Sequence, residues 1–276
     1  MKHHLLLLLI GAACLTAAAA QDVGNPVRLV PKGHLGVGLQ AGFIFLQDFE
    51  HYELVRTYWD GSTATDVKDA KFEDDEQFLV TLALGLHDRV NVNAGLGMTG
   101  RGRWLSEEAG VNDWEGTVGR RFLWYAGGKA LLWKHAAGPE LIAAVKYLRY
   151  TSRDVGNWVY APDGSSAEAL GWETDDTITY WQASASGILA WPVGRFAPYV
   201  GLGYCHSHFD LDGLWVYAPY PEITVAYDGR TTREKNLAVL PGVEVDLGDG
   251  WSFTVQGMFV SETSISAGVS YRIKIW

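Results

Sequence analysis

The sequence has little cysteine and no long apolar run after its first residues. Of its 2 cysteines, Cys14 lies in that first stretch, so a processed chain would keep Cys205 alone and could form no intrachain disulfide. A transmembrane helix needs about 20 consecutive apolar residues, and the chain has no such run beyond its start. A disulfide scaffold and a helical membrane protein are both excluded.

Positive charge is also scarce, with 22 Lys and Arg against 32 Asp and Glu and a formal net charge of -10. Binding of nucleic acid calls for a basic patch that neutralises phosphates. The charge therefore excludes nucleic acid as a partner. It also disfavours direct contact with anionic lipid headgroups, unless divalent cations bridge the two.

The chain starts with the pattern of a secretory signal peptide. In MKHHLLLLLIGAACLTAAAAQD a lysine precedes an apolar run, and small residues follow. Gly11 stands where a lipid-attachment motif has a branched apolar residue, so ordinary cleavage is favoured over lipidation of Cys14. We predict a signal peptide over 1 to 20, a short leading segment over 21 to 32 and one domain over 33 to 276.

Alternation of apolar and polar residues with period two dominates the rest of the chain, and no segment shows the period of a helix. In the last stretch, ETSISAGVSYRIKIW, Ile265, Val269 and Ile273 share one face, while Ser266 and Arg272 lie on the other. Segments with this pattern are predicted as strands, and there are ten: 34 to 46, 77 to 86, 90 to 100, 120 to 133, 139 to 150, 177 to 191, 195 to 208, 234 to 247, 251 to 260 and 264 to 275.

Short and long connections alternate between these segments. LHDRV, WKHAAGPE, WPVGR and LGDGW have the composition of tight turns. The other connections are long and polar and are predicted to be loops: 47 to 76, 101 to 119, 151 to 176 and 209 to 233. An even number of strands with short turns at one end and long loops at the other is typical of a transmembrane barrel. We predict an all-β fold, a single closed antiparallel transmembrane β-barrel of about ten strands.

The two faces of the predicted strands differ in chemistry. One face is apolar and includes Leu39, Leu82 and Val243, while the other carries polar side chains such as Gln40 and Thr254. A soluble barrel would place the apolar face inside, but this face also bears rings near both strand ends: Phe78, Tyr204 and Phe259 toward the long connections, and Trp191, Phe196 and Trp251 toward the turns. Two belts of rings match the two interfaces of a bilayer. We therefore predict lipid outside and a polar lumen.

With these features the chain resembles bacterial outer-membrane β-barrel proteins over residues 33 to 276. The resemblance rests on the strand and turn pattern, on GLHDRVNVNAGLG at 85 to 97, which is typical of a periplasmic hairpin, and on the last strand. It implies export to the outer membrane of a Gram-negative bacterium, outer-membrane lipid as surroundings, surface-exposed loops, and a periplasmic place for residues 21 to 32.

The last strand also resembles an assembly signal. In that superfamily the barrel-assembly machinery recognises a glycine followed by alternating apolar residues and a final aromatic residue. Gly268, Tyr271, Ile273 and Trp276 resemble that pattern, with Trp276 out of phase after Lys274. The resemblance thus implies the assembly machinery as a partner.

The sharpest local motif is CHSHFDLDG, in which four side chains with metal-binding chemistry repeat at every second residue: His206, His208, Asp210 and Asp212. They would share one face of a strand and could form a zinc or transition-metal set. Consecutive positions on one strand rarely surround one ion, so a polar strand tip is the favoured interpretation. A rim-active hydrolase of the protease or lipid-modifying type, using His206, Asp210 and Asp212, is the alternative function, although neither a matching Asp pair nor a His-x-Ser arrangement accompanies them.

The pentapeptide WVYAP occurs twice, with Trp158 and Tyr160 in the first copy and Trp215 and Tyr217 in the second. The favoured interpretation is that these rings pack the connections against each other above the rim, because exposed rings need cover. An aromatic recognition surface for sugar or protein is the alternative.

Charged residues of both signs fall on the predicted lumen face, mostly close to the short turns: Lys129, Glu140, Lys146, Glu244, Asp246, Arg272 and Lys274. A ten-stranded lumen is narrow, and a lone buried charge is unfavourable. We therefore hypothesise that Glu244 and Asp246 pair with Arg272 and Lys274 as a periplasmic plug. A water-filled lumen in which each group is solvated is the alternative.

Taken together, these patterns predict an integral outer-membrane barrel that is not an enzyme and uses no cofactor. Its expected role is structural, in surface binding or adhesion, or in permeation of a small solute. The sequence indicates no particular extracellular partner, and the hydrolase named above is the alternative.

Overall fold

The computed structural model describes residues 28–108, 111–136, 138–232, 236–260 and 262–276. The predicted signal peptide and residues 21–27 lie outside the described residues. No helix in the described ranges is long and apolar enough to cross a membrane. The strands are β1 (His34–Tyr58), β2 (Thr63–His87), β3 (Val90–Thr99), β4 (Gly102–Glu108), β5 (Val111–Val118), β6 (Phe122–Lys134), β7 (Glu140–Tyr160), β8 (Ser165–Ser166), β9 (Trp172–Ala190), β10 (Phe196–Tyr217), β11 (Thr224–Thr232), β12 (Leu237–Gly248), β13 (Trp251–Val260) and β14 (Thr263–Lys274).

Ten of these strands close into one antiparallel ring, called the wide ring here. Its order is β1, β2, β3, β6, β7, β9, β10, β12, β13, β14 and back to β1. Each strand of the wide ring overlaps one of the ten predicted segments, and residues 234–235 of the segment 234 to 247 lie outside the described residues. The prediction of an all-β, closed antiparallel barrel of about ten strands is confirmed.

Beyond the wide ring, the chain forms a second closed ring of eight strands, called the narrow ring. Strands β1, β2, β7, β9 and β10 continue into it, and β4, β5 and β11 complete it in the order β1, β2, β4, β5, β7, β9, β10, β11 and back to β1. Most of the predicted loops are therefore strand. The prediction that 47 to 76, 101 to 119, 151 to 176 and 209 to 233 are loops is wrong for most of their described residues, while 109–110 and 233 lie outside the described residues.

The reason for this error lies in the alternation itself. In the narrow ring the period of two continues, but the apolar side chains now point inward and the polar ones point outward. Phe49, Phe72, Trp104 and Phe209 are fully buried there. Polar side chains alternate with these rings and give the segments the mean composition of a loop. Each segment is nevertheless a strand with one buried face.

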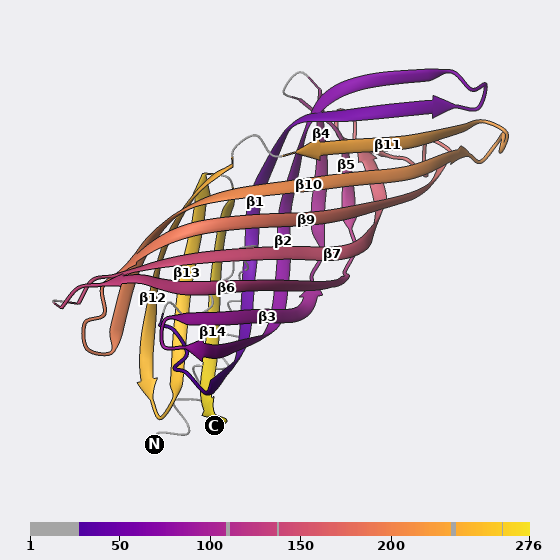
Figure 1. The fold of residues 1–276 in the computed structure, drawn as a ribbon. Helices are drawn as coiled ribbons and strands as arrows, with labels where there is room; N and C mark the ends of the chain where they lie inside the picture. The colour runs from indigo at the N-terminus through magenta and orange to yellow at the C-terminus, as the bar shows by residue number, and fades with distance from the viewer. Residues whose placement is uncertain (1–27, 109–110, 137, 233–235, 261) are drawn as a thin grey trace.

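The narrow ring has two strands fewer than the wide ring because the β13–β14 hairpin is short and does not reach it. Strand β14 begins at Thr263, opposite Leu46 of β1. Farther along β1, Glu53 pairs directly with Arg230 of β11. In Figure 1, the orange-to-yellow strands β12, β13 and β14 stop well short of the tips of β1, β2 and β10. The barrel therefore narrows where that hairpin ends.

The outward face changes from apolar to charged between the two rings. On the wide ring the exposed side chains include Leu39, Val80, Leu82, Leu96, Val145, Leu202 and Leu237, and exposed rings lie near both of its ends. On the narrow ring they include Glu53, Asp69, Arg103, Asp154, Glu173, Asp175, Asp212, Asp228 and Arg230. The apolar face of the wide ring thus lies outside, as the belts of aromatic residues predict.

Replacing Leu82 with arginine is expected to lower the stability of the barrel in a bilayer by roughly 2 to 4 kcal/mol, because a charge on the lipid face is unfavourable near the midplane. Thr65 is an exposed residue of the same strand, but it lies in the narrow ring. Thr65→Arg is the matched control and should change stability by less than about 0.5 kcal/mol. Urea titration in lipid vesicles measures both, and equal losses would contradict a bilayer around the wide ring alone.

Candidate functional site

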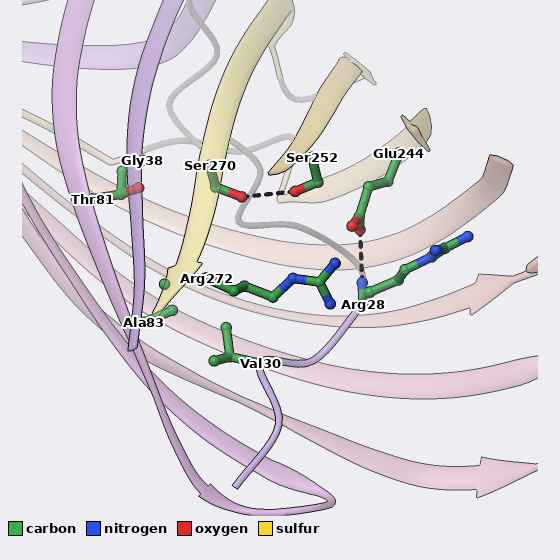
Figure 2. Close-up of a pocket in the computed structure, with 10 residues that line it drawn as sticks. Arg28, Val30, Gly38, Thr81, Ala83, Glu244, Ser252, Ser270 and Arg272 are labelled. Atoms are coloured by element: carbon green, nitrogen blue, oxygen red, sulfur yellow. Dashed lines mark hydrogen bonds between the residues drawn. The ribbon is translucent and has the colours of Figure 1, made fainter. Parts of the chain in front are cut away.

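The turn end of the lumen is filled by residues 28–30, called the N-terminal plug here, while Pro31 and Lys32 after them are exposed. The backbone N–H of Arg28 donates to Glu244 Oε2 at 2.8 Å, and its Nη1 donates to Asp246 Oδ2 at 3.0 Å. Val30 is only 4% exposed. Figure 2 shows Arg28 and Val30 inside the ring of strands, with Glu244 and Arg272 turned toward them. The space left among these residues is about 10 Å³, room for about one water molecule.

Part of the predicted lumen cluster meets at this plug. Arg272 Nη2 lies 3.6 Å from Asp246 Oδ2, and Glu244 is buried with Arg28, Lys129 and Arg272 as the cations that act on it. Asp246 thus has two arginine partners. Arg28 was not among the candidates because it precedes the first strand and carries no period-two signal.

The other members of the predicted cluster lie apart from the plug. Glu140 pairs with Lys134 at 2.6 Å beside a short turn. The Nζ atom of Lys146 lies 4.7 Å from the centroid of the Tyr125 ring. Lys274 is exposed and forms no ion pair within the described part of the chain. The hypothesised pairing of Lys274 with the acids is therefore not present.

An aromatic core fills the lumen where the wide ring gives way to the narrow one. The rings of Trp104 and Phe209 lie 4.7 Å apart, and Phe49 packs edge-on against Phe209 at 5.0 Å. Tyr150 and Tyr180 stack at 4.7 Å. These rings come from strands on different sides of the barrel, so they block the lumen at this level.

A buried ion pair lies beside the aromatic core. Arg153 and Asp75 are both 0% exposed, and Nη2 of Arg153 donates to Asp75 Oδ1 at 2.7 Å. The guanidinium also donates to the carbonyls of Gly119 at 2.8 Å and Gly100 at 3.1 Å. These glycines lie where β3 gives way to β4 and β5 gives way to β6. Arg153 therefore joins the two rings by satisfying carbonyls at the breaks between them.

Inside the narrow ring, a carboxylate is held by the two copies of the WVYAP repeat. Trp158 Nε1 donates to Asp176 Oδ2 at 2.5 Å, and Trp215 Nε1 donates to the same oxygen at 2.8 Å. Burial raises the pKa of Asp176 to about 6, although the two indole donors favour the charged form. The tyrosines of the repeat, Tyr160 and Tyr217, pack against other tryptophan rings. The structure thus brings the two copies together around Asp176, which the sequence did not single out.

The histidines and aspartates of CHSHFDLDG lie on the outward face of β10. His208 Nε2 lies 3.0 Å from Asp210 Oδ1, whereas His206 packs on the ring of Trp181 with 5.4 Å between centroids. Among the residues that the structure describes, no group of three or more His, Cys, Asp or Glu side chains could hold a metal ion. Residues two apart on a strand are spaced by about 7 Å and point the same way. The possible metal set with Asp212, which was the less favoured interpretation, is therefore not assembled, and the hydrolase alternative gains no support.

The residues of the proposed assembly signal lie along β14 and just after it. Tyr271 and Ile273 are partly exposed on the outward face. Strand β14 ends before Trp276, whose backbone N–H donates to the carbonyl of Gly33 at 3.3 Å. Gly268 pairs with β1 and β13. Recognition of these residues by an assembly machinery stays a prediction.

No family model matches the chain, and no curated protein matches it at the required significance. Among solved structures, the outer membrane protein OprG from Pseudomonas aeruginosa is 9% identical with a TM-score of 0.47, and the match covers 90% of this chain and 99% of that chain. The translocator domain of the autotransporter NalP from Neisseria meningitidis is 11% identical with a TM-score of 0.40, covering 98% and 95%. The transport unit of the autotransporter AIDA-I from Escherichia coli is 11% identical with a TM-score of 0.38, covering 96% and 97%.

The strand pairing of this chain defines its fold. That pairing closes ten antiparallel strands with an apolar outward face. In fold, the chain resembles bacterial outer-membrane β-barrel proteins, as the sequence predicts.

Proposed function

We propose that this chain is an integral outer-membrane barrel that holds a rigid β-structured extension outside the cell and presents it for binding. The change of outward face carries the proposal. Apolar side chains surround the wide ring, which suits a bilayer, and charged side chains surround the narrow ring, which suits water. In this orientation the short turns and the N-terminal plug face the periplasm.

The resting barrel is further proposed to be closed to ions. The N-terminal plug fills one end of the lumen, and the aromatic core fills it where the rings meet. These two barriers lie in series, so a small solute would cross only if both moved. Surface binding is therefore favoured over permeation.

Cysteine labelling tests the orientation. Ser62 at the β1–β2 tip and Asp88 in the β2–β3 turn are exposed, whereas Cys205 is buried and should give little background. A membrane-impermeant maleimide is expected to label Ser62→Cys in intact cells, and Asp88→Cys only after the outer membrane is permeabilised. Equal labelling of both variants in intact cells would overturn the orientation.

Planar-bilayer recording of the full chain tests the closed state. The wild type is expected to give no large steady current, because both barriers are packed. A large steady pore in the wild type would sink the proposal of two barriers in series, while leaving the membrane orientation to the labelling experiment.

A further inference from the structure

The narrow ring holds a half-open cavity of about 80 Å³. This is about half of the roughly 150 Å³ cavity that holds benzene in an engineered protein core, so it suits a compact group and not an extended molecule. Half of its lining residues are aromatic, with six rings that come from six different strands: Tyr52, Trp104, Trp114, Trp158, Trp215 and Tyr227. The charged residues of the lining are Arg56, Lys68 and Asp176.

The charges around this cavity leave one carboxylate without a cation. Arg56 is paired with Asp66, and Lys68 is paired with Asp113. Asp176 accepts hydrogen bonds from two indoles, but within the described residues it has no ion-pair partner. Arg56 and Lys68 line the cavity, whereas their partners Asp66 and Asp113 do not. Counted together with these partners, and with Asp176 ionised, the charged groups at the cavity carry one net negative charge.

The aromatic rings and the carboxylate of Asp176 both favour a positively charged group. The faces of aromatic rings are negative and attract cations, most strongly when water is excluded. A carboxylate taken out of water without a counter-charge is unfavourable, and a bound cation would offset that penalty. We propose that this cavity binds the ammonium head group of a small organic cation, held between Asp176 and the surrounding rings.

The route to the cavity is marked by the wall residues that are only half-buried. Arg56, Trp114 and Tyr227 are partly exposed, whereas Trp104 and Trp158 are buried. A head group would therefore approach from the side of these three residues. Binding of such a head group does not depend on whether the barrel conducts ions.

Calorimetric titration of the full chain in detergent micelles tests the site, with tetramethylammonium chloride as the probe. The wild type is expected to bind tetramethylammonium at pH 7.5, and Asp176→Asn should weaken binding by at least about tenfold, because a charge-assisted contact is lost. The amide keeps an oxygen that can accept from both indoles. Asp175→Asn removes the same charge from the exposed neighbouring position and is the matched control, expected to bind as the wild type does.

Two comparison ligands separate the contributions of charge and shape. The sodium ion of sodium chloride has the positive charge but no methyl groups to pack on the rings. The molecule tert-butanol has a shape similar to that of tetramethylammonium but no charge. Neither is expected to bind measurably. Binding of tert-butanol as tight as that of the ammonium, absence of ammonium binding to the wild type, or equal binding by Asp176→Asn would each overturn the proposal. If Asp176→Asn does not fold, Trp114→Leu takes its place and should weaken ammonium binding without changing the circular dichroism.

A pH series gives a readout that needs no variant. Asp176 is ionised above its pKa of about 6, so binding is expected to hold at pH 7.5 and to weaken roughly tenfold by pH 5 as the carboxyl takes up a proton. Other charged or titratable groups act around the cavity: Tyr52, Arg56, Lys68, Asp113, Asp175, Tyr227 and Asp228. Unchanged affinity between pH 7.5 and 5 would contradict a role for the carboxylate.

Discussion

Replacing Arg153 with methionine is expected to lower the free energy of unfolding of the barrel by roughly 3 to 5 kcal/mol. The change leaves the carboxylate of Asp75 buried without its counter-charge and removes the donors to the carbonyls of Gly100 and Gly119. An unpaired buried charge costs more than the lost contact itself, because the group cannot regain water. Urea titration in lipid vesicles, followed by tryptophan fluorescence, measures the loss.

An exposed arginine–aspartate pair on the same part of the barrel provides the control. Arg121 donates to Asp154 at 2.7 Å, but the two side chains are 44% and 68% exposed. Arg121→Met should therefore cost less than about 1 kcal/mol. Replacing Asp75 with leucine in the Arg153→Met background should restore much of the lost stability, because packed apolar residues can substitute for a buried pair. Equal losses for Arg121→Met and Arg153→Met would show that burial does not set the strength of this pair.

Replacing Glu244 with glutamine and Asp246 with asparagine should release the N-terminal plug from the lumen. Glu244 accepts a hydrogen bond from the backbone of Arg28, and Asp246 accepts one from its guanidinium. Both hydrogen bonds are strengthened by the negative charge of the acceptor, which the amides lack. Val30→Cys reports on release, because the wild-type side chain is buried. A soluble thiol reagent is expected to modify this cysteine at least about tenfold faster in the double variant, as loss of charged hydrogen bonds favours local opening.

Asp249→Asn serves as the control for the plug, since Asp249 is an exposed acid in the β12–β13 turn at the same end of the barrel. It should leave the modification rate of Val30→Cys unchanged. Conductance of the double variant is expected to stay low, because the aromatic core still fills the lumen farther along. An unchanged modification rate in the double variant would mean that the acids do not hold the segment.

The wide ring could be predicted from the sequence because its alternation is local. Strand β13, for example, has the bounds expected from the segment 251 to 260. The narrow ring was missed because the same period of two carries inward rings such as Phe72 and Trp104 among outward charges. Averaged over a segment, that pattern has the polarity of a loop. Buried apolar residues on one face of a polar segment, such as Phe209, Leu211 and Trp215 in β10, are the signal that would have identified it.

The functional contacts depend on pairs that no local pattern contains. Arg28 and its acidic partners are more than two hundred positions apart in the sequence. The WVYAP repeat pointed to Trp158 and Trp215, but their shared partner Asp176 lies in a different segment with no motif of its own. Such contacts are set by the register of the closed rings, which the sequence alone does not fix.

Because the β13–β14 hairpin is short, the barrel is closed by two different strand pairs, one in each ring. The narrow ring closes where β11 meets β1, as in the pair of Glu53 with Arg230, and needs nothing from the last three strands. The wide ring closes only when β14 meets β1, which joins Lys274 to His34. Pairings between distant parts of a chain are the slow events of folding. The pairing of β11 with β1 spans a shorter stretch of chain than the pairing of β14 with β1, so the narrow ring can close first. The β13–β14 hairpin then docks between β12 and β1.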